Sequence, residues 1–167
     1  PGKNVLATQR ELHYRMEPRQ DGFFQVGILG TPPDTVSLEE RFDLVIGSGR
    51  KGQTYLYWGK DDQLFQLPVS YWTEVRSWVN SPGYGDQTLE FSRPVVPRCL
   101  ECHASSFDAV EANRYRRQGY VLGVSCERCH GPGKQHAELN PPGAPKPADQ
   151  AIVNPAKLPG VRQLEAL

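Results

Sequence analysis

The sequence carries no excess charge of either sign, because its 19 basic and 19 acidic residues cancel. A balanced charge argues against the broad electropositive field with which proteins bind nucleic acids or anionic membrane surfaces. Long apolar runs are also missing, and no stretch approaches the roughly 20 residues that a membrane-spanning helix needs. Hydrophobic residues make up only 38% of the 167 residues, which is low for a globular chain. We therefore expect no nucleic-acid partner, no transmembrane segment and a core that draws on additional apolar material.

Cysteine and histidine are scarce, with four of each, yet all four cysteines fall into two copies of one short motif. The motif is C-x-x-C-H, and it occurs at 99–103 and again at 126–130. The motif residues are Cys99, Cys102, His103, Cys126, Cys129 and His130.

Each copy of C-x-x-C-H predicts the covalent attachment of one haem c. The two thiols form thioether bonds with the haem vinyl groups, and the histidine that follows binds the iron from one face. One turn of chain places both sulfurs along one porphyrin edge and the imidazole beneath the metal. We therefore expect two haem groups, with His103 and His130 as their proximal iron ligands. The short stretch between the motifs, 104–125, would keep both haems in one compact unit.

Two other uses of these cysteines are possible. Two C-x-x-C pairs at this separation are close to the spacing of a zinc ribbon, in which four cysteines bind one metal. Disulfide bonds are the other alternative. Neither requires a histidine directly after each second cysteine, and both copies have one. The sequence therefore favours haem over zinc, and zinc over disulfides.

The ligands on the opposite faces of the two irons are harder to assign. His136 would have to pass around a wide porphyrin to reach the other face of haem two, so we assign it to haem one. For haem two the candidates are His13 and Met16, which lie three apart on a predicted strand and point to opposite faces. We prefer His13, with Met16 as the alternative, since methionine also fills cores. A ligand from another subunit or an open position remains a third option.

We expect an α+β fold, in which a small antiparallel β-rich N-terminal half packs on a di-haem segment of loops and short helices. Strands are predicted at 10–17, 23–29, 41–46, 54–58 and 63–67, with a hairpin turn at Asp21 and Gly22.

Helices are predicted at 71–79, where apolar residues recur with helical spacing, at 108–118 and at 134–139. The division that follows is a β-rich region at 1–93, the di-haem segment at 94–140 and a proline-rich extended tail at 141–167. The first two regions should share a core.

Haem propionates carry negative charge and need cationic partners. Several arginines flank the haem motifs and form the best group of candidates, although the sequence does not distinguish among them. They are Arg93, Arg98, Arg114, Arg116, Arg117 and Arg128.

Several runs of the sequence resemble a large group of bacterial multihaem c-type cytochromes, of the cytochrome c domain and tetratricopeptide-linked type. These runs are 42–57, 67–72, 80–84, 98–104 and 126–133, and the resemblance extends over most of 20–157. It implies that His136 ligates a haem and that the protein transfers electrons outside the cytoplasm. Members of the group usually carry further C-x-x-C-H sites, so this chain resembles a two-haem segment of them.

The expected function is that of a di-haem cytochrome in the periplasm, on the cell surface or outside the cell, because haem c is attached beyond the cytoplasm. Its partners would be other redox proteins or copies of itself, and a sharper option is the repeating subunit of an extracellular cytochrome filament. The alternative is an oxidoreductase that acts on a small nitrogen or sulfur compound at an open haem iron. An electron-transfer protein is preferred over an enzyme.

Overall fold

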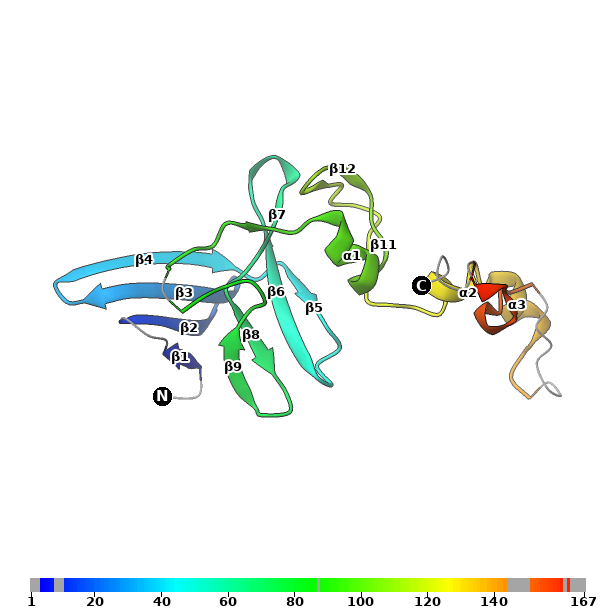
Figure 1. Cartoon of the computed structure of the whole chain (residues 1–167), viewed down its shortest axis with the longest axis horizontal. Helices are drawn as coiled ribbons and strands as arrows, with labels where there is room; N and C mark the ends of the chain where they lie inside the picture. Colours follow the sequence, from blue (N-terminus) through cyan, green and yellow to red (C-terminus); the bar gives the residue numbers. More distant parts are fainter. Residues whose placement is uncertain (1–3, 8–10, 87, 144–150, 161, 163–167) are drawn as a thin grey trace.

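The computed structural model describes the chain except for residues 1–3, 8–10, 87, 144–150, 161 and 163–167 (Figure 1). Antiparallel β-strands dominate the described residues, and their three α-helices all come after residue 96. No helix among these residues is long and apolar enough to cross a membrane.

The first sheet is antiparallel and has the strand order β1-β2-β3-β4. Its strands are β1 (Val5–Ala7), β2 (Leu12–Arg19), β3 (Gly22–Thr31) and β4 (Asp34–Arg41). The hairpin between β2 and β3 turns just before Gly22, as the Asp-Gly pair predicts, and pairs Arg19 with Gly22. Strand β4 has no counterpart in the sequence-based prediction, because its residues are nearly all exposed and only Val36 and Leu38 are apolar.

The second sheet has the order β10-β7-β6-β8-β9, and β5 pairs with residues 54–56 of β6. Its strands are β5 (Leu44–Ile46), β6 (Gly52–Trp58), β7 (Leu64–Gln66), β8 (Val69–Trp72), β9 (Ser77–Asn80) and β10 (Arg93–Pro94), and the 3-10 turn η1 (Lys60–Asp62) joins β6 to β7. The predicted strands at 41–46, 54–58 and 63–67 correspond to β5, β6 and β7.

Strand β6 separates two hydrophobic cores, because its successive side chains point to opposite faces. Tyr55 and Tyr57 pack toward the first sheet, whereas Leu56 packs toward the helical part of the chain. The core on the first-sheet side also contains Leu12, Tyr14, Met16, Leu67, Val69 and Phe91. The core on the other side contains Leu44, Ile46, Leu64, Val95, Leu100, Ala104 and Tyr115.

A buried glutamine joins the two sheets. The Gln25 side chain on β3 donates to the Val69 carbonyl oxygen at 2.6 Å and accepts from the Val69 N–H at 3.0 Å. Both polar atoms of the amide are therefore satisfied in a fully buried position, where an unpaired amide would cost stability.

The predicted helix at 71–79 is wrong, since this stretch is the hairpin of β8 and β9. Tyr71 lies opposite Trp78, and their rings meet edge-on with centroids 5.0 Å apart. Arg76 in the turn has a φ of 51°, a left-handed conformation that a helix does not contain. The apolar spacing fits both structures, and aromatic and β-branched residues favour the strand once a neighbouring strand is available.

The predicted helix at 108–118 is also wrong. The stretch forms the hairpin of β12 (Ala109–Glu111) and β13 (Arg114–Tyr115), enclosed by the pair β11 (Ala104–Ser106) and β14 (Val121–Leu122). Contacts with β7 decide the outcome, because the Leu64 N–H donates to the Asn113 carbonyl oxygen and Tyr115 is buried in the second core.

The remaining elements are short helices and turns. They are α1 (Pro97–His103), α2 (Glu127–His130), α3 (Lys134–Leu139) and the 3-10 turn η2 (Pro155–Lys157). Helix α3 matches its prediction. Figure 1 places the first sheet at one end of the molecule and α2 and α3 at the other.

The structure can be compared with the predicted division into regions at the boundary near residue 93 and in the tail. Strand β10 crosses the expected boundary at 93 and pairs with β7, so the first two regions are joined through one sheet and the second core. In the tail, the described part of 141–167 includes η2, while 144–150 lie outside the described residues.

Candidate functional site

Helix α1 carries the first motif and is fixed by its sequence at both ends. Pro97 occupies the first turn, where its missing N–H costs nothing, and the helix ends where Ala104 returns to extended backbone. Leu100 is buried in the second core. Burial of Leu100 holds the helix so that Cys99 and His103, four residues apart, face the same side.

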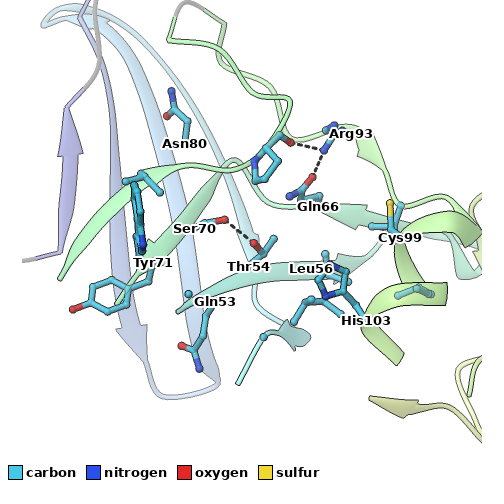
Figure 2. A pocket seen from close by; sticks show the side chains of 18 of the residues that line it. Gln53, Thr54, Leu56, Gln66, Ser70, Tyr71, Asn80, Arg93, Cys99 and His103 are labelled. Atoms are coloured by element: carbon cyan, nitrogen blue, oxygen red, sulfur yellow. Dashed lines mark hydrogen bonds between the residues drawn. The ribbon is translucent and has the colours of Figure 1, made fainter. Parts of the chain in front are cut away.

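That side of α1 faces a cavity of about 500 Å³ (Figure 2). Cys99, Leu100 and His103 form one wall. The remaining lining comes from strands β5, β6, β7, β8, β9 and β10 and from the connections at 47, 82 and 95. The volume lies within the range of small-molecule and cofactor sites, and much of the lining is aliphatic or aromatic.

Hydrogen bonds join several of the polar groups that line this cavity. The Thr54 hydroxyl lies 2.8 Å from the Ser70 hydroxyl, which lies 2.7 Å from that of Ser81. On another side, the Arg93 guanidinium donates to the Gln66 side-chain oxygen and to the Pro82 carbonyl oxygen (Figure 2). Arg93 is the one cation among the lining residues.

The second motif lies on and just before α2. Cys126 precedes the helix and is exposed, while Cys129 and His130 are half-buried. No residue of α2 is buried in either core, so the helix depends on other contacts for its position.

One of these contacts fixes the ring of His130. Its Nδ1 atom lies 2.7 Å from the Val153 carbonyl oxygen, and the Val153 N–H donates to the His130 carbonyl oxygen at 3.0 Å. A carbonyl partner at Nδ1 selects the tautomer with hydrogen on that atom and leaves Nε2 as the lone-pair donor for a metal.

Further contacts connect the second motif to the first. The Arg128 Nε and Nη2 atoms both donate to the Glu101 carbonyl oxygen, at 3.2 and 3.0 Å. Glu101 lies inside the first motif, so this arginine spans directly from one motif to the other. The Ser105 hydroxyl adds a second connection, since it accepts from the Ser125 N–H at 2.7 Å.

Residues 82–131 match the family model of cytochrome c554 and c-prime. The matched range covers less than half of the chain, contains both C-x-x-C-H motifs and leaves out His13 and His136. It supports a c-type cytochrome, with covalent haem c and electron transfer, as the class that this chain resembles. No curated protein and no solved structure matches the chain.

The surroundings of α1 fit the haem c of a c-type cytochrome. Cys99 and His103 open onto an apolar cavity, and a cation lies in its lining, where an anionic propionate needs a partner. All four cysteines are free thiols, as thioether formation requires. The residues that would hold haem c are those of the motifs, Cys99, Cys102, His103, Cys126, Cys129 and His130.

The zinc and disulfide alternatives find no support in this geometry. Among the described residues, which include all four cysteines, no three His, Cys, Asp or Glu side chains lie together as a possible metal site. The same four cysteines form no disulfide.

The candidates for the iron ligands opposite the motif histidines lie in three different places in the structure. His136 lies half-buried on α3, beside the second motif and outside the cavity lining. His13 lies half-buried on β2, in the sheet at the far end of the molecule from α2 (Figure 1). Met16 is only 7% exposed and packs in the first core with Leu12 and Tyr14, opposite to His13 as the strand spacing predicts.

Several contributors to the site were not identified from the sequence. No sequence motif marks these groups, because each contacts a residue that is distant along the chain. They are the hydroxyl groups of Thr54 and Ser70, the Gln66 amide and the Val153 carbonyl. Arg93 was found only as one of six flanking arginines.

Proposed function

We propose that the protein is a di-haem c-type cytochrome that carries electrons outside the cytoplasm. The observation that carries this proposal is the placement of the first motif, with Cys99 and His103 on one side of α1 against an apolar cavity of about 500 Å³. A second C-x-x-C-H motif on α2 supports the count of two, and the family match over 82–131 includes both motifs.

In this proposal the residues of the chain have simple roles. Cys99 and Cys102 bind the first group through thioethers, and His103 binds its iron. Cys126 and Cys129 bind the second, and His130 binds its iron through Nε2, with its ring oriented by the Val153 carbonyl. When bound, haem c supplies reversible one-electron chemistry at its iron.

The contacts between the motifs support exchange of electrons within the chain. Arg128 and Ser105 hold the start of α2 to the end of α1 by hydrogen bonds, two from the arginine and others between Ser105 and Ser125. Cys99, Cys102 and Cys126 are exposed, so both motifs offer a point of contact with a redox partner.

The test is to count and classify the haems in the matured protein. A pyridine haemochrome assay should give two haems per chain, and the oxidised and reduced visible spectra should show haem c. One haem per chain, or none, would refute the proposal, and a colourless metal-binding protein would favour zinc.

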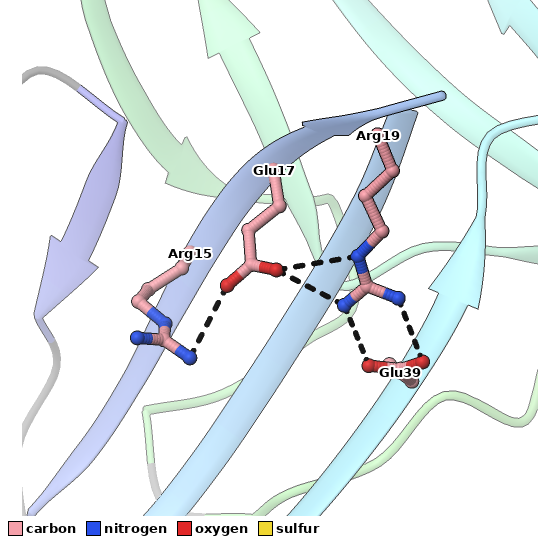
Figure 3. A network of polar contacts seen from close by, with 4 residues as sticks. All are labelled: Arg15, Glu17, Arg19 and Glu39. Atoms are coloured by element: carbon pink, nitrogen blue, oxygen red, sulfur yellow. Dashed lines mark hydrogen bonds and ion pairs between the residues drawn. The ribbon is translucent and has the colours of Figure 1, made fainter. Parts of the chain in front are cut away.

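A filament subunit is the finer form of this proposal. Because β2 and α2 lie at opposite ends of the molecule, His13 of one chain is suited to complete the second haem site of the next chain (Figure 1). The charged side chains on the sheet face that carries His13 neutralise one another. They are Arg15, Glu17, Arg19 and Glu39, which form a continuous chain of ion pairs (Figure 3). Arg19 accordingly lowers the pKa of the Glu39 carboxyl.

An oxidoreductase is the second candidate, and one observation favours it. The cavity lining contains His103 and no other histidine or methionine. If no ligand enters from elsewhere, the iron bound by His103 keeps an open position for a small nitrogen or sulfur compound. Our assignment of His136 to this iron predicts the opposite, a low-spin spectrum, so the spin state of the first haem separates the two functions.

A further inference from the structure

Arg93 occupies a special position at the cavity beside α1. It lies on β10, six residues before Cys99 along the chain that leads into α1, and its side chain contributes to the lining (Figure 2). The residue is half-buried, so its charge is partly removed from water.

The guanidinium is held from one side only. Its Nη1 atom donates to the Gln66 side-chain oxygen and to the Pro82 carbonyl oxygen. Gly83 packs directly on the group: a Cβ atom at this position would lie 2.4 Å from the Arg93 Cζ atom, and the φ of +87° also favours glycine. The Tyr84 hydroxyl, which donates to the Gln66 carbonyl oxygen at 2.5 Å, fixes the same loop against β7.

Two donors of Arg93 are left over. Within the described part of the chain, neither Nε nor Nη2 donates a hydrogen bond to another group, although Nη1 donates two. Nε and Nη2 together form a fork that matches the two oxygens of a carboxylate.

The charge of Arg93 also lacks an acidic partner. No carboxylate of the described residues lies within 4.0 Å of it, and the Gln66 and Pro82 oxygens are neutral. The other arginines near the motifs differ: Arg128 donates to the backbone of Glu101, and the rest are ion-paired. The ion-paired ones are Arg98, Arg114, Arg116 and Arg117.

We propose that Arg93 binds a propionate carboxylate of the haem held by Cys99, Cys102 and His103, through its Nε and Nη2 atoms. The inference rests on the proposed function and selects one arginine from the six that flank the motifs. Gln66, Pro82 and Gly83 act as positioning residues. Gln66 and Pro82 bind the Nη1 atom and Gly83 packs on the guanidinium, which leaves Nε and Nη2 facing away from these three residues.

The test is a spectroelectrochemical titration of the two-haem protein at several pH values. Loss of a positive charge beside the haem favours the ferric state, so Arg93→Gln should lower the midpoint potential of the first haem. At a separation of roughly 10 Å, the effect on its reduction equilibrium is about tenfold. The freed propionate should also titrate nearer to neutral pH, which makes the potential pH-dependent there. The potential of the second haem should stay unchanged.

Three further variants make the result specific. Arg93→Lys keeps the charge and should shift the potential less than Arg93→Gln. Gly83→Ala keeps the charge but displaces the guanidinium, and should lower the potential in the same direction. Arg116→Gln removes an exposed arginine that is already paired with Asp108, and should leave both potentials unchanged.

The outcomes separate this inference from the proposed function. If both haems are present and Arg93→Gln has the wild-type potentials and pH dependence, the propionate contact is refuted and the cytochrome stands. If Arg93→Gln does not mature, an unchanged potential in Gly83→Ala refutes the contact. If the wild-type chain carries no haem at 99–103, the proposed function and the contact fail together.

Discussion

The Nδ1 atom of His130 lies 2.7 Å from the carbonyl oxygen of Val153, 23 residues further along the chain. The backbone of the same two residues forms a second hydrogen bond, from the Val153 N–H to the His130 carbonyl oxygen at 3.0 Å. A stretch of the C-terminal tail is therefore part of the second motif's surroundings. Since an Nδ1 hydrogen bond increases the basicity of Nε2, the tail is placed to tune His130 as the iron ligand that we propose.

Val153→Pro removes the N–H of this pair and should weaken the contact on His130. With a less basic imidazole, the ferric state of the second haem is less stabilised, so its midpoint potential should rise while that of the first haem is unchanged. The measurement is a spectroelectrochemical titration. Val153→Ala, which keeps the backbone N–H, is the matched control and should behave as wild type. Equal potentials for the second haem in the proline and alanine variants would contradict the role of the tail.

The two motifs should respond differently to loss of their cysteines. Cys126→Ser with Cys129→Ser should reduce the haem count from two to one and leave the melting temperature nearly unchanged, because α2 has no residue buried in a core. Cys99→Ser with Cys102→Ser should also remove one haem, but it leaves the cavity of about 500 Å³ without its apolar group. We expect a fall of several degrees in melting temperature, at about 2–4 °C per kcal/mol for a chain of this size.

Pyridine haemochrome assays and thermal unfolding followed by circular dichroism measure both effects. The assignment of the first haem to the cavity would be wrong if the two double variants lost the same stability.

Sequence patterns were sufficient wherever the deciding contacts are local. The Asp21–Gly22 signal predicts the β2–β3 hairpin to within one residue, because the turn is formed by Gln20 and Asp21 and Gly22 begins β3. The helix prediction for 71–79 was wrong because the apolar spacing of this stretch suits a helix and a hairpin equally. The choice was made by the edge-on contact of Tyr71 with Trp78 and by the pairing of β8 with β6.

In the candidate site, too, the residues in local motifs were predictable and those that act through distant contacts were not. The cysteines and histidines of the motifs are recognisable because haem attachment demands them at fixed spacing. Arg93 and Val153 are not, since their roles depend on Gln66, 27 residues before the arginine, and on His130, 23 residues before the valine. Sequence could name six arginines, and only the hydrogen bonds and ion pairs distinguish one of them.

His13→Ala tests the contribution of the first sheet to a neighbouring chain. At low protein concentration the variant and the wild type should have the same spectrum, because His13 does not reach α2 within one chain. At high concentration only the wild type should assemble and become fully low-spin. Ser37→Ala, on the same outer face of the sheet, is the control. Analytical ultracentrifugation and electron micrographs would count against the filament if the wild type stayed monomeric at the highest concentration.

Three tyrosines make stability sensitive to alkaline pH. Burial, as the largest cause, raises the pKa of Tyr14, Tyr57 and Tyr115 from 10.0 to about 12. The hydroxyls of Tyr57 and Tyr115 donate to the Phe91 and Val95 carbonyl oxygens, at 2.7 and 2.8 Å, which also requires the protonated form.

Between pH 10 and pH 12 the unfolded chain has released these protons and the folded chain has kept them. The unfolded state therefore binds fewer protons, and the free energy of unfolding falls as the pH rises through this window, whereas below pH 10 these tyrosines contribute their full stabilisation.

Urea unfolding at pH 9, 10, 11 and 11.5 should show a progressive loss of the free energy of unfolding. Tyr115→Phe should lower stability at pH 9 by about 1 kcal/mol, through the lost hydrogen bond, and should lose less on going to pH 11.5. Because Tyr115 packs in the same core as Leu100 of α1, the Soret band should shift in parallel with the loss. A free energy of unfolding that stays constant from pH 9 to pH 11.5 would show that these hydroxyls are not buried as the structure describes.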